Sequence, residues 1–227
     1  AIFSTGDELR MPGQPLGPGQ IVSSNGLALA AFARAEGAVP LDLGIIPDRL
    51  DATIAAVRRA RDWGADVLVT AGGASVGDYD LVQPALAAEG MELGFWKVAL
   101  RPGKPLMHGR IGTMRVLGLP GNPVSTYVCA LLFLVPLLRR LSGRTDIATQ
   151  IVPAILGRDL AANDHRQDYM RSRFETDAAG RQVVMPIRVQ DSSMMSALVA
   201  SNCLLVRPPH APPARAGEEC HVIPLVL

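Results

Sequence analysis

The sequence is poor in the residues that build disulfide frameworks and structural metal sites. Its three cysteines are widely spaced and form no Cys-x-x-Cys pair, and its four histidines lack the spacing of a ligand set. The cysteines are Cys129, Cys203 and Cys220, and the histidines are His108, His165, His210 and His221. This pattern excludes a disulfide scaffold and a zinc module, and it predicts a reduced, cytoplasmic protein.

An excess of charge of one sign is also lacking. Lysine and arginine number 22 against 21 aspartates and glutamates, which gives a net charge of +1. The basic residues form no block, and the pair Arg139-Arg140 is typical of the exposed end of a helix. A broad nucleic-acid-binding surface is therefore not indicated, and we expect no nucleic-acid partner.

No apolar run has the length of a membrane span. The longest, Val128 to Leu138, falls short of the roughly 20 residues that a transmembrane helix needs, and it contains Pro136. We interpret it as a buried helix or a subunit interface and expect no membrane association. The sequence starts without Met or a signal peptide, and residues 1–4 look like a strand already under way. We therefore expect a fragment whose N-terminal part is absent.

The first part of the chain alternates between apolar strands and amphipathic helices. Strands are expected at 1–4, 39–46, 66–70, 95–100, 106–108 and 115–119, and helices at 25–36, 48–61, 79–89 and 121–141. Asn25 is expected to cap the first helix, whose inner face is expected to hold Leu27, Ala30, Phe32 and Ala33. Most strands are apolar on both faces, which predicts a three-layer α/β domain with a mostly parallel sheet. Ligands of such sheets bind at the carboxyl ends of the strands.

The pattern changes after Ser142-Gly143-Arg144. Five strands are expected at 151–155, 167–175, 182–189, 203–207 and 220–225, with a single helix at 193–200. Four prolines between positions 208 and 213 mark a stiff loop. We therefore expect two domains, an α/β domain over residues 1–143 and a small β-rich, barrel-like domain over residues 144–227.

Four loops that leave the carboxyl ends of predicted strands carry candidate chemistry. In the first, Asp7 and Glu8 follow Thr5-Gly6 and offer two adjacent carboxylates, which suit Mg²⁺. Taken alone, an ordinary acidic turn is the simpler interpretation. The second loop, AGGASVGDYD over residues 71–80, offers glycines and backbone N–H groups that suit a phosphate. Its alternative is a tight turn in which Asp78 caps the next helix.

The other two loops combine proline and glycine with cations or a helix start. Arg101-Pro102-Gly103-Lys104-Pro105, with Lys97 upstream, places rigid cations where oxyanions are bound, although a solvated basic turn is the usual interpretation. Gly118 to Ser125, GLPGNPVS, places Asn122 as N-cap and Pro123 as the first helical residue, which local structure alone largely explains. Ser125 and the free N–H groups of the helix start would add an anion site.

Together, these loops resemble those of the MoeA family of molybdopterin molybdenumtransferases, which includes the E domain of gephyrin. The motifs TGDEL, GGASVGD, PGKP and GLPGNPVS occur in the family's order. The resemblance covers the α/β domain closely and the β-rich remainder in outline. It implies a MogA-like molybdopterin-binding domain followed by the small C-terminal domain of the family.

The resemblance also implies an activity and a site. The enzyme would insert molybdate into adenylylated molybdopterin and release AMP, with Mg²⁺ required. The implied catalytic residues are Glu8, Asp48 and Asp80, with Asp7, Glu8 and Asp80 at the metal and Pro120 and Pro123 as structural prolines. The implied substrate-binding residues are Thr5, Gly6, Gly72, Gly73, Ser75, Gly77, Lys97, Arg101, Lys104 and Ser125.

The sequence departs from the family at three points. Arg101 stands where Lys is common, and Ser23 stands where an Asp is usual. Family members also carry about as much chain again before this point, and those domains build a homodimer and cover the site. Two other functions stay open: a MogA-type adenylyltransferase, which lacks the second proline-glycine motif and the β-rich tail, and a non-catalytic scaffold.

Overall fold

The computed structural model describes residues 1–73 and 81–225, which form two units. The first unit comprises Ala1–Val98 and Gly103–Ile147, and the second comprises Ala99–Pro102 and Ala148–Leu227. The division after Ile147 lies four residues beyond the boundary that we expected at residue 143. The short segment Ala99–Pro102 was expected in the first domain but belongs to the second unit.

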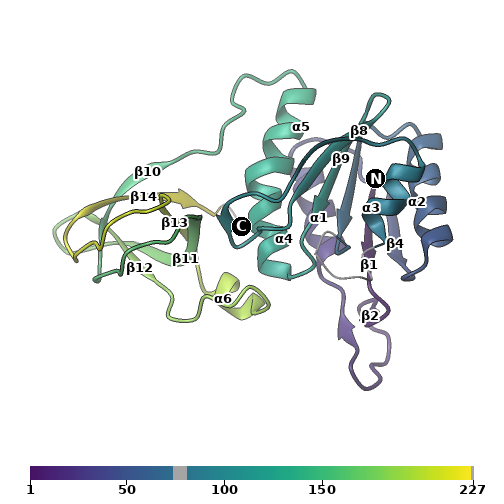
Figure 1. Cartoon of the computed structure of the whole chain (residues 1–227). Helices are drawn as coiled ribbons and strands as arrows, with labels where there is room; N and C mark the ends of the chain where they lie inside the picture. The colour runs from purple at the N-terminus through teal and green to yellow at the C-terminus, as the bar shows by residue number, and fades with distance from the viewer. Residues whose placement is uncertain (74–80, 226–227) are drawn as a thin grey trace. The chain divides into compact units, whose positions relative to one another are not determined.

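A six-stranded sheet forms the centre of the first unit, in the order β4-β1-β5-β9-β8-β6 (Figure 1). Strands β4, β1, β5 and β9 run parallel to one another, whereas β8 runs antiparallel to both of its neighbours, β9 and β6. The bounds are β1 Ile2–Thr5, β4 Asp42–Ile46, β5 Val67–Ala71, β6 Glu92–Trp96, β8 Met107–Ile111 and β9 Met114–Leu119. The α/β fold with a mostly parallel sheet is confirmed, and the strands expected at 106–108 and 115–119 pair as the antiparallel hairpin β8–β9.

Helices cover both faces of this sheet (Figure 1). Helices α2 and α3 lie on one face, and α1, α4 and α5 on the other. The bounds are α1 Asn25–Ala35, α2 Leu50–Asp62, α3 Val82–Ala88, α4 Pro123–Cys129, the π-helical turn Ala130–Leu134 and α5 Val135–Leu141. Phe3, Leu68 and Val116, from neighbouring strands, are fully buried in one cluster with Val57 of α2 and Leu86 of α3. The continuously apolar strands are thus explained by burial on both faces.

The helix from Pro123 to Leu141 is long and apolar enough to cross a membrane by length and composition alone. Val124, Val128 and Cys129 are fully buried, and Phe32 of α1 packs against Tyr127 with ring centroids 4.8 Å apart. These contacts are those of a core helix, the first of the two interpretations given to this run. The π-helical turn ends two residues before Pro136, which has no N–H to donate to the preceding turn, and a wider turn accommodates the missing α-helical bond.

Two details of the predicted elements are wrong. Leu27 is 55% exposed, whereas Ala30 and Ala33 are buried as expected and Leu29 takes the further place on the inner face of α1. The strand expected at 95–100 is two strands, because β6 ends at Trp96 and β7, Leu100–Arg101, pairs with the second unit. Lys97 separates them with a left-handed φ of 70°, a conformation that no strand can continue.

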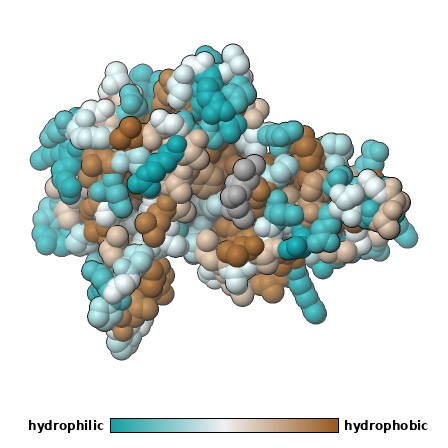
Figure 2. Space-filling view, turned by 180° about the vertical axis from the view of Figure 1, so that it is seen from behind, coloured by the Kyte–Doolittle hydropathy of each residue, from teal (hydrophilic) through white to brown (hydrophobic). Residues whose placement is uncertain are grey.

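The loop after β1 is an ordered arm that projects from the first unit (Figures 1 and 2). It holds the short strands β2 Leu9–Arg10 and β3 Ile21–Val22 and two Pro-Gly-Gln turns. The side-chain oxygens of Gln14 and Gln20 each accept a 2.9 Å bond from the residue three positions earlier. These bonds and the prolines order an arm that exposes apolar side chains. Those side chains are Met11, Leu16, Ile21 and Val22.

The second unit is a small β barrel. Its strands follow the order β12-β10-β14-β13-β11-β7, and β12 also pairs with β11, which closes the barrel. The bounds are β10 Val152–Leu156, β11 Gln167–Thr176, β12 Gln182–Pro186, β13 Cys203–Arg207, β14 Glu219–Pro224 and the helix α6 Met195–Val199. Ala154, Leu156, Val184, Cys203, Leu205 and Val222 form the core. The β-rich, barrel-like prediction is confirmed.

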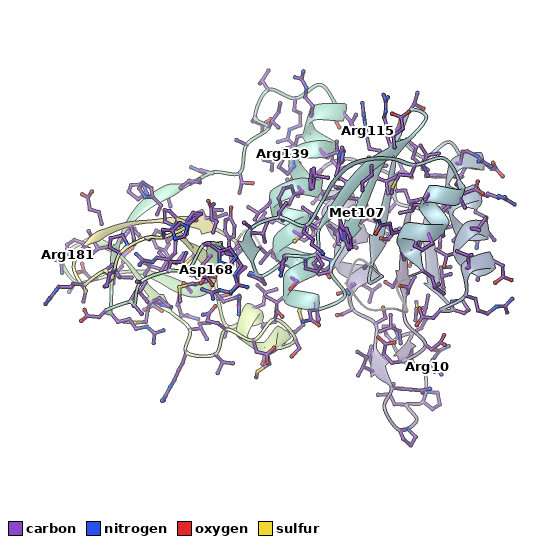
Figure 3. All side chains as sticks on the ribbon, in the orientation of Figure 1. Arg10, Met107, Arg115, Arg139, Asp168 and Arg181 are labelled. Atoms are coloured by element: carbon purple, nitrogen blue, oxygen red, sulfur yellow. The ribbon has the colours of Figure 1, made fainter. Side chains whose placement is uncertain are left out.

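An ion-pair network joins the ends of α1 and α5. Glu36 accepts two 2.8 Å hydrogen bonds from Arg139 and one of 2.7 Å from Arg144. Arg139 is labelled in Figure 3. The Glu36 side chain is only 10% exposed, and the Arg139 hydrogen bonds lower the pKa of its carboxyl group below the ordinary 4.5. The charged form of Glu36 is therefore stabilised in the folded chain.

Replacing Glu36 with Gln is expected to lower the free energy of unfolding at neutral pH. Because the folded pKa is depressed, this contribution is complete above about pH 4.5 and is lost as pH falls through the folded pKa. The difference between wild type and E36Q should therefore shrink on acidification, which urea unfolding between neutral and acid pH measures. Glu175→Gln, at an exposed pair with Arg173, is the control. A difference that does not vary with pH would contradict the role of the Glu36 charge.

Candidate active site

Four strand-end loops meet at one edge of the first unit's sheet. The register places Thr5 beside Ile46, Ser4 beside Ala71 and Ala71 beside Leu119. The loops that follow these parallel strands therefore leave the sheet at the same edge. They are the acidic loop, which holds Asp7 and Glu8, the segment Pro47-Asp48, the glycine loop, of which the structure describes Gly72-Gly73, and the loop Pro120-Gly121-Asn122.

Backbone segments approach each other at this edge more closely than side chains would allow. Gly72 has a φ of 95°, and a Cβ there would lie 2.8 Å from the carbonyl oxygen of Thr5. At Gly73, with a φ of 63°, a Cβ would lie 2.1 Å from Val82 Cγ2. Gly121 lies next to this turn, and a Cβ there would be in ordinary van der Waals contact with the Cα of Gly72, at 3.5 Å. Gly72 and Gly73 thus allow the start of the glycine loop to pack directly against Thr5 and Val82, which places that loop beside the acidic residues at this edge.

A long-range hydrogen bond holds the loop before α4. Asn25 donates from Nδ2 to the carbonyl oxygen of Gly121 at 2.8 Å and makes no side-chain cap on α1, so the expected capping role is wrong. Thr126 donates its hydroxyl to the carbonyl of Pro120 at 2.6 Å. Asn122 occupies the N-cap position and Pro123 begins the helix, as predicted. Ser125, in the first turn, is only 5% exposed.

Two carboxylates from neighbouring strand ends pair through backbone bonds. The N–H of Asp7 donates to Asp48 Oδ2 at 3.3 Å, and the N–H of Asp48 donates to Asp7 Oδ1 at 3.2 Å. Glu8 turns back over Gly6, whose Cβ, if present, would lie 2.5 Å from Glu8 Oε2. The three carboxylates are exposed, and the fold gathers Asp7, Glu8 and Asp48 from positions 41 residues apart.

The chemistry of these donors fits Mg²⁺. Carboxylate oxygens are the hard ligands that Mg²⁺ prefers, and Mg²⁺ commonly uses one or two of them together with water and substrate phosphates. Over residues 1–73 and 81–225, no three His, Cys, Asp or Glu side chains form a complete metal site. The protein donors described here would therefore hold Mg²⁺ only together with other ligands. Asp80, Ser75 and Gly77, predicted for the same site, lie outside the described residues.

The three cations predicted to bind oxyanions, Lys97, Arg101 and Lys104, are divided between the two units. Lys97 and Lys104 belong to the first unit and are exposed, and Val98 N–H donates to the Lys104 carbonyl at 3.0 Å. The Lys97 Nζ lies 4.1 Å from the centroid of the Trp96 ring, a cation–π contact. Arg101 belongs to the second unit, where β7 pairs with the start of β11.

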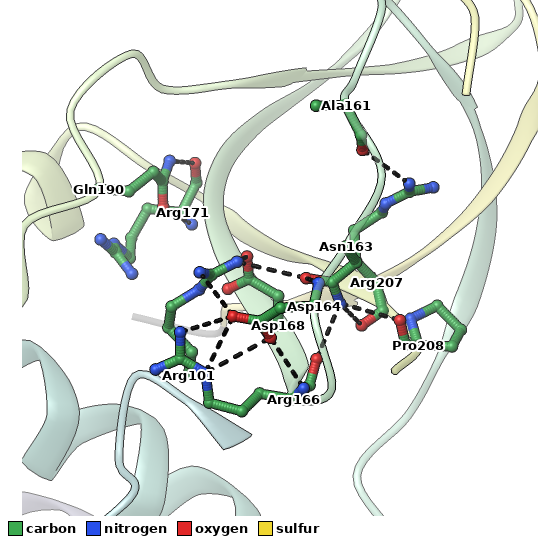
Figure 4. A network of polar contacts seen from close by, with 10 residues as sticks. All are labelled: Arg101, Ala161, Asn163, Asp164, Arg166, Asp168, Arg171, Gln190, Arg207 and Pro208. Atoms are coloured by element: carbon green, nitrogen blue, oxygen red, sulfur yellow. Dashed lines mark hydrogen bonds and ion pairs between the residues drawn. The ribbon is translucent and has the colours of Figure 1, made fainter. Parts of the chain in front are cut away.

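Arg101 lies in a polar network of the second unit (Figure 4). Its Nη2 donates to Asp168 Oδ2 at 2.5 Å and to Asn163 Oδ1 at 3.3 Å, and its Nη1 lies 3.5 Å from Asp164 Oδ2. The hydrogen bond to Asp168 is the main cause of the raised Arg101 pKa. The loop was expected to offer this cation to an oxyanion, but Arg101 is paired instead, because its acceptors lie more than 60 residues away in sequence and only the fold brings them to it.

Arg171 is a candidate functional residue that the sequence analysis missed. It lies on β11, is only 1% exposed, and its Nε and Nη2 have no hydrogen-bond partner within residues 1–73 and 81–225. Burial lowers its pKa, although Asp168 and Asp191 act in the opposite direction. Buried polar groups are nearly always satisfied, so this guanidinium is suited to an anionic ligand. The sequence does not show that Arg171 is buried, because the exposed Arg173 lies two residues away on the same strand and looks equivalent to it.

Comparison with known proteins agrees with this architecture. The family model described as a probable molybdopterin binding domain matches residues 1–140, and that of the MoeA C-terminal region (domain IV) matches residues 153–225. The molybdopterin molybdenumtransferase of Haemophilus influenzae is 33% identical over 98% of this chain and 55% of its own length. That of Bacillus subtilis is 33% identical over 91% of this chain and 48% of its own.

A solved structure supports the same assignment. The molybdopterin biosynthesis MoeA protein from Pyrococcus horikosii superposes with a TM-score of 0.83 at 29% identity, covering 98% of this chain and 53% of that one. The chain thus spans about half the length of the relatives that it matches. By its two matched regions and their order, the chain belongs to the MoeA family of molybdopterin molybdenumtransferases.

Proposed function

We propose that this chain carries the catalytic domain of a molybdopterin molybdenumtransferase. The reaction inserts molybdate into adenylylated molybdopterin and releases AMP. The observation that carries the proposal is the backbone junction at Gly72, Gly73 and Gly121, which lies at the same sheet edge as the acidic residues. A phosphate-binding surface beside carboxylates is what a metal-assisted reaction at a phosphoanhydride requires.

The phosphates are assigned to the glycine junction. The main chain that would contact the phosphates belongs to Thr5, Gly6, Gly72 and Gly73, which lie close together. The helix that begins at Pro123 directs its N-terminal dipole toward this edge. Ser75 and Gly77 extend the same loop. The bond from Asn25 to Gly121 keeps the loop before α4 in place, with Pro120 and Pro123 restricting its conformations.

The acidic residues are assigned to metal binding and to chemistry at the phosphoanhydride. Asp7, Glu8 and Asp80 would hold Mg²⁺, with Asp48 beside Asp7. When bound, Mg²⁺ would neutralise phosphate charge and assist cleavage of the anhydride. Glu8 and Asp48, both exposed and at neighbouring strand ends, would orient the attacking group.

Molybdate is assigned to the basic residues. Lys97 and Lys104 are exposed and available to attract an oxyanion to the first unit. In the second unit, Arg171 offers a buried guanidinium with two nitrogens that lack a partner in the described chain. Such a group binds an oxyanion through charge-assisted hydrogen bonds. The C-terminal unit would then contribute to substrate binding.

The resemblance extends the proposal to the whole protein. Because the chain spans about half of its relatives, we expect the longer form to be a cytoplasmic homodimer whose further domains cover the site. The separate chain would bind its ligands and turn over slowly or not at all.

The test measures molybdate-dependent release of AMP from adenylylated molybdopterin with Mg²⁺. It compares this chain with a form extended to the length of the curated relatives. Release of AMP by the extended form supports the proposal. If this chain alone releases none, the added domains complete the site. Ligand binding without release by either form would contradict it in favour of a scaffold. Adenylylation of molybdopterin from ATP would instead indicate a MogA-type adenylyltransferase.

A further inference from the structure

We propose that the ion pair between Arg101 and Asp168 anchors the basic loop, residues 97–104, and thereby positions Lys97 and Lys104 to bind an oxyanion. This inference rests on the proposed function, which assigns molybdate to these lysines. It makes Arg101 and Asp168 positioning residues, neither of which contacts the oxyanion. Their side chains come from paired strands of the second unit, β7 and β11 (Figure 4).

The basic loop holds every lysine of the chain. The sequence has 22 lysines and arginines, of which only Lys97 and Lys104 are lysines. Both residues are exposed. A lysine carries a compact charge on a flexible stem, so the region that its ammonium group can reach depends on how the backbone beneath it is held. The conformation of the loop therefore decides where the two charges lie.

The stem of the loop is an extension of the hairpin formed by β6 and β8. Lys97 N–H donates to the Leu106 carbonyl at 2.8 Å, and Val98 N–H donates to the Lys104 carbonyl at 3.0 Å. Lys97 has a left-handed φ of 70°, a conformation that a residue with a side chain keeps only where its surroundings fix it. The residues that follow Lys97 thus have to be held as well.

The tip of the loop is held by the second unit. Ala99–Pro102 belongs to that unit, where Leu100 and Arg101 pair in parallel with the start of β11. Gln167 N–H donates to the Ala99 carbonyl at 2.9 Å, and Leu100 is only 6% exposed. The tip is joined to both lysines by the chain itself, so an ordered tip restricts the backbone on both sides.

The side chain of Arg101 reinforces this strand pairing. Nη2 donates to Asp168 and Asn163, and Nη1 lies against Asp164. Two of these acceptors are fixed by further bonds, because Asn163 donates Nδ2 to three carbonyls and Asp164 accepts bonds from Arg166. The Asp168 side chain is only 11% exposed, so water screens its pair with Arg101 less than it screens a surface pair.

Removal of Asp168 distinguishes an anchor from a direct ligand. If Arg101 bound the oxyanion itself, loss of the neighbouring carboxylate would free its guanidinium group and strengthen anion binding. If Arg101 anchors the loop, the same change releases the tip. Lys97 and Lys104 then have to be ordered when the oxyanion binds, which weakens binding.

Molybdate binding, measured by calorimetry on this chain, tests the inference. D168A and R101Q should each weaken binding by about 5- to 10-fold, because the loop is no longer held in its binding conformation. R101K keeps a cation that can pair with Asp168 and should stay within about 3-fold of wild type. K104Q should weaken binding by about 10-fold. In the K104Q background, D168A should cost less than about 3-fold more, because the anchor acts through the lysines.

Hydrogen exchange without ligand gives a second readout. Release of the tip should speed exchange of the main-chain N–H groups of Gln167 and Val98 in D168A but not in R101K. Glu175→Gln, which removes a carboxylate of β11 from an exposed pair with Arg173, is the control and should change neither binding nor exchange. Unfolding in urea shows whether each variant is folded.

The outcomes separate this inference from the proposed function. Unchanged or tighter binding by D168A, together with weak binding by K104Q, would overturn the inference and leave molybdate assigned to the lysines. Equal losses from D168A with and without Lys104, or exchange that D168A does not alter, would overturn it too. If wild type does not bind molybdate, or K104Q binds it as wild type does, the assignment to the lysines fails and the inference fails with it.

Discussion

Replacement of Glu8 by Gln is expected to abolish molybdate-dependent release of AMP, with a loss of about 10²-fold or more. The carboxylate lies at the end of β1, exposed and turned back over Gly6, beside the pair formed by Asp7 and Asp48. Gln keeps the size of the side chain but removes the charge that would bind Mg²⁺ or orient the attacking group. The measurement is AMP release by the extended form.

The control for this variant is Glu92→Gln. Glu92 is an exposed glutamate on the edge strand β6 of the same sheet, paired with Arg110 at 2.6 Å, and its loss should leave activity unchanged. Both variants should unfold at the wild-type urea concentration, because neither removes a buried contact. Activity retained by E8Q would remove Glu8 from the mechanism, and a shifted unfolding midpoint would indicate a structural role.

Replacement of Gly73 by Ala is expected to lower the free energy of unfolding by about 2–5 kcal/mol. The left-handed backbone costs an alanine about 1–2 kcal/mol, and an overpacked site costs about 1–3 kcal/mol more. The crowding is severe because the new Cβ would lie 2.1 Å from Val82 Cγ2 and 3.1 Å from Thr5 Oγ1. The loop must then move, so binding of adenylylated molybdopterin should weaken as well.

Gly112→Ala is the matched control for this variant. Gly112 has a similar φ of 57° at the β8–β9 turn, but a Cβ added there would have nothing within 4 Å. G112A should therefore show only the backbone cost and should not alter ligand binding. The difference between the two variants measures the crowding at the site. Equal losses would mean that the close approach of Gly73 to Val82 is not a packing constraint, since the backbone cost alone would then explain both.

The gathering of the site loops could be predicted from the sequence because of the geometry of parallel strands. Val67–Ala71 and Met114–Leu119 are apolar apart from Thr70 and Arg115, which favours a sheet covered on both faces. Parallel strands end at a common edge, so the loops after them must lie near each other. The acidic loop, the glycine loop and the loop before α4 were placed together by this argument alone.

The partners of individual side chains could not be predicted in the same way. Asn25 has the position of a helix cap, but Gly121, 96 residues away, supplies an acceptor that local sequence does not reveal. A single strand was expected at 95–100 from its apolar pattern. The left-handed backbone of Lys97 ends the strand there, and Arg101 belongs to the second unit. Both errors have one cause: the competing interaction is with residues distant in sequence.

The sequence by itself determined the two-domain order, the mostly parallel sheet, the β-rich second unit and the sheet edge that holds the loops. These follow from hydrophobic period and strand ends, which are local properties of the chain. Only the tertiary structure decided that Arg101 is paired with Asp168 and that Arg171 is buried with two nitrogens that have no partner in the described chain. The charge state and availability of a side chain depend on burial and on the charges around it, and the fold brings those together across the barrel.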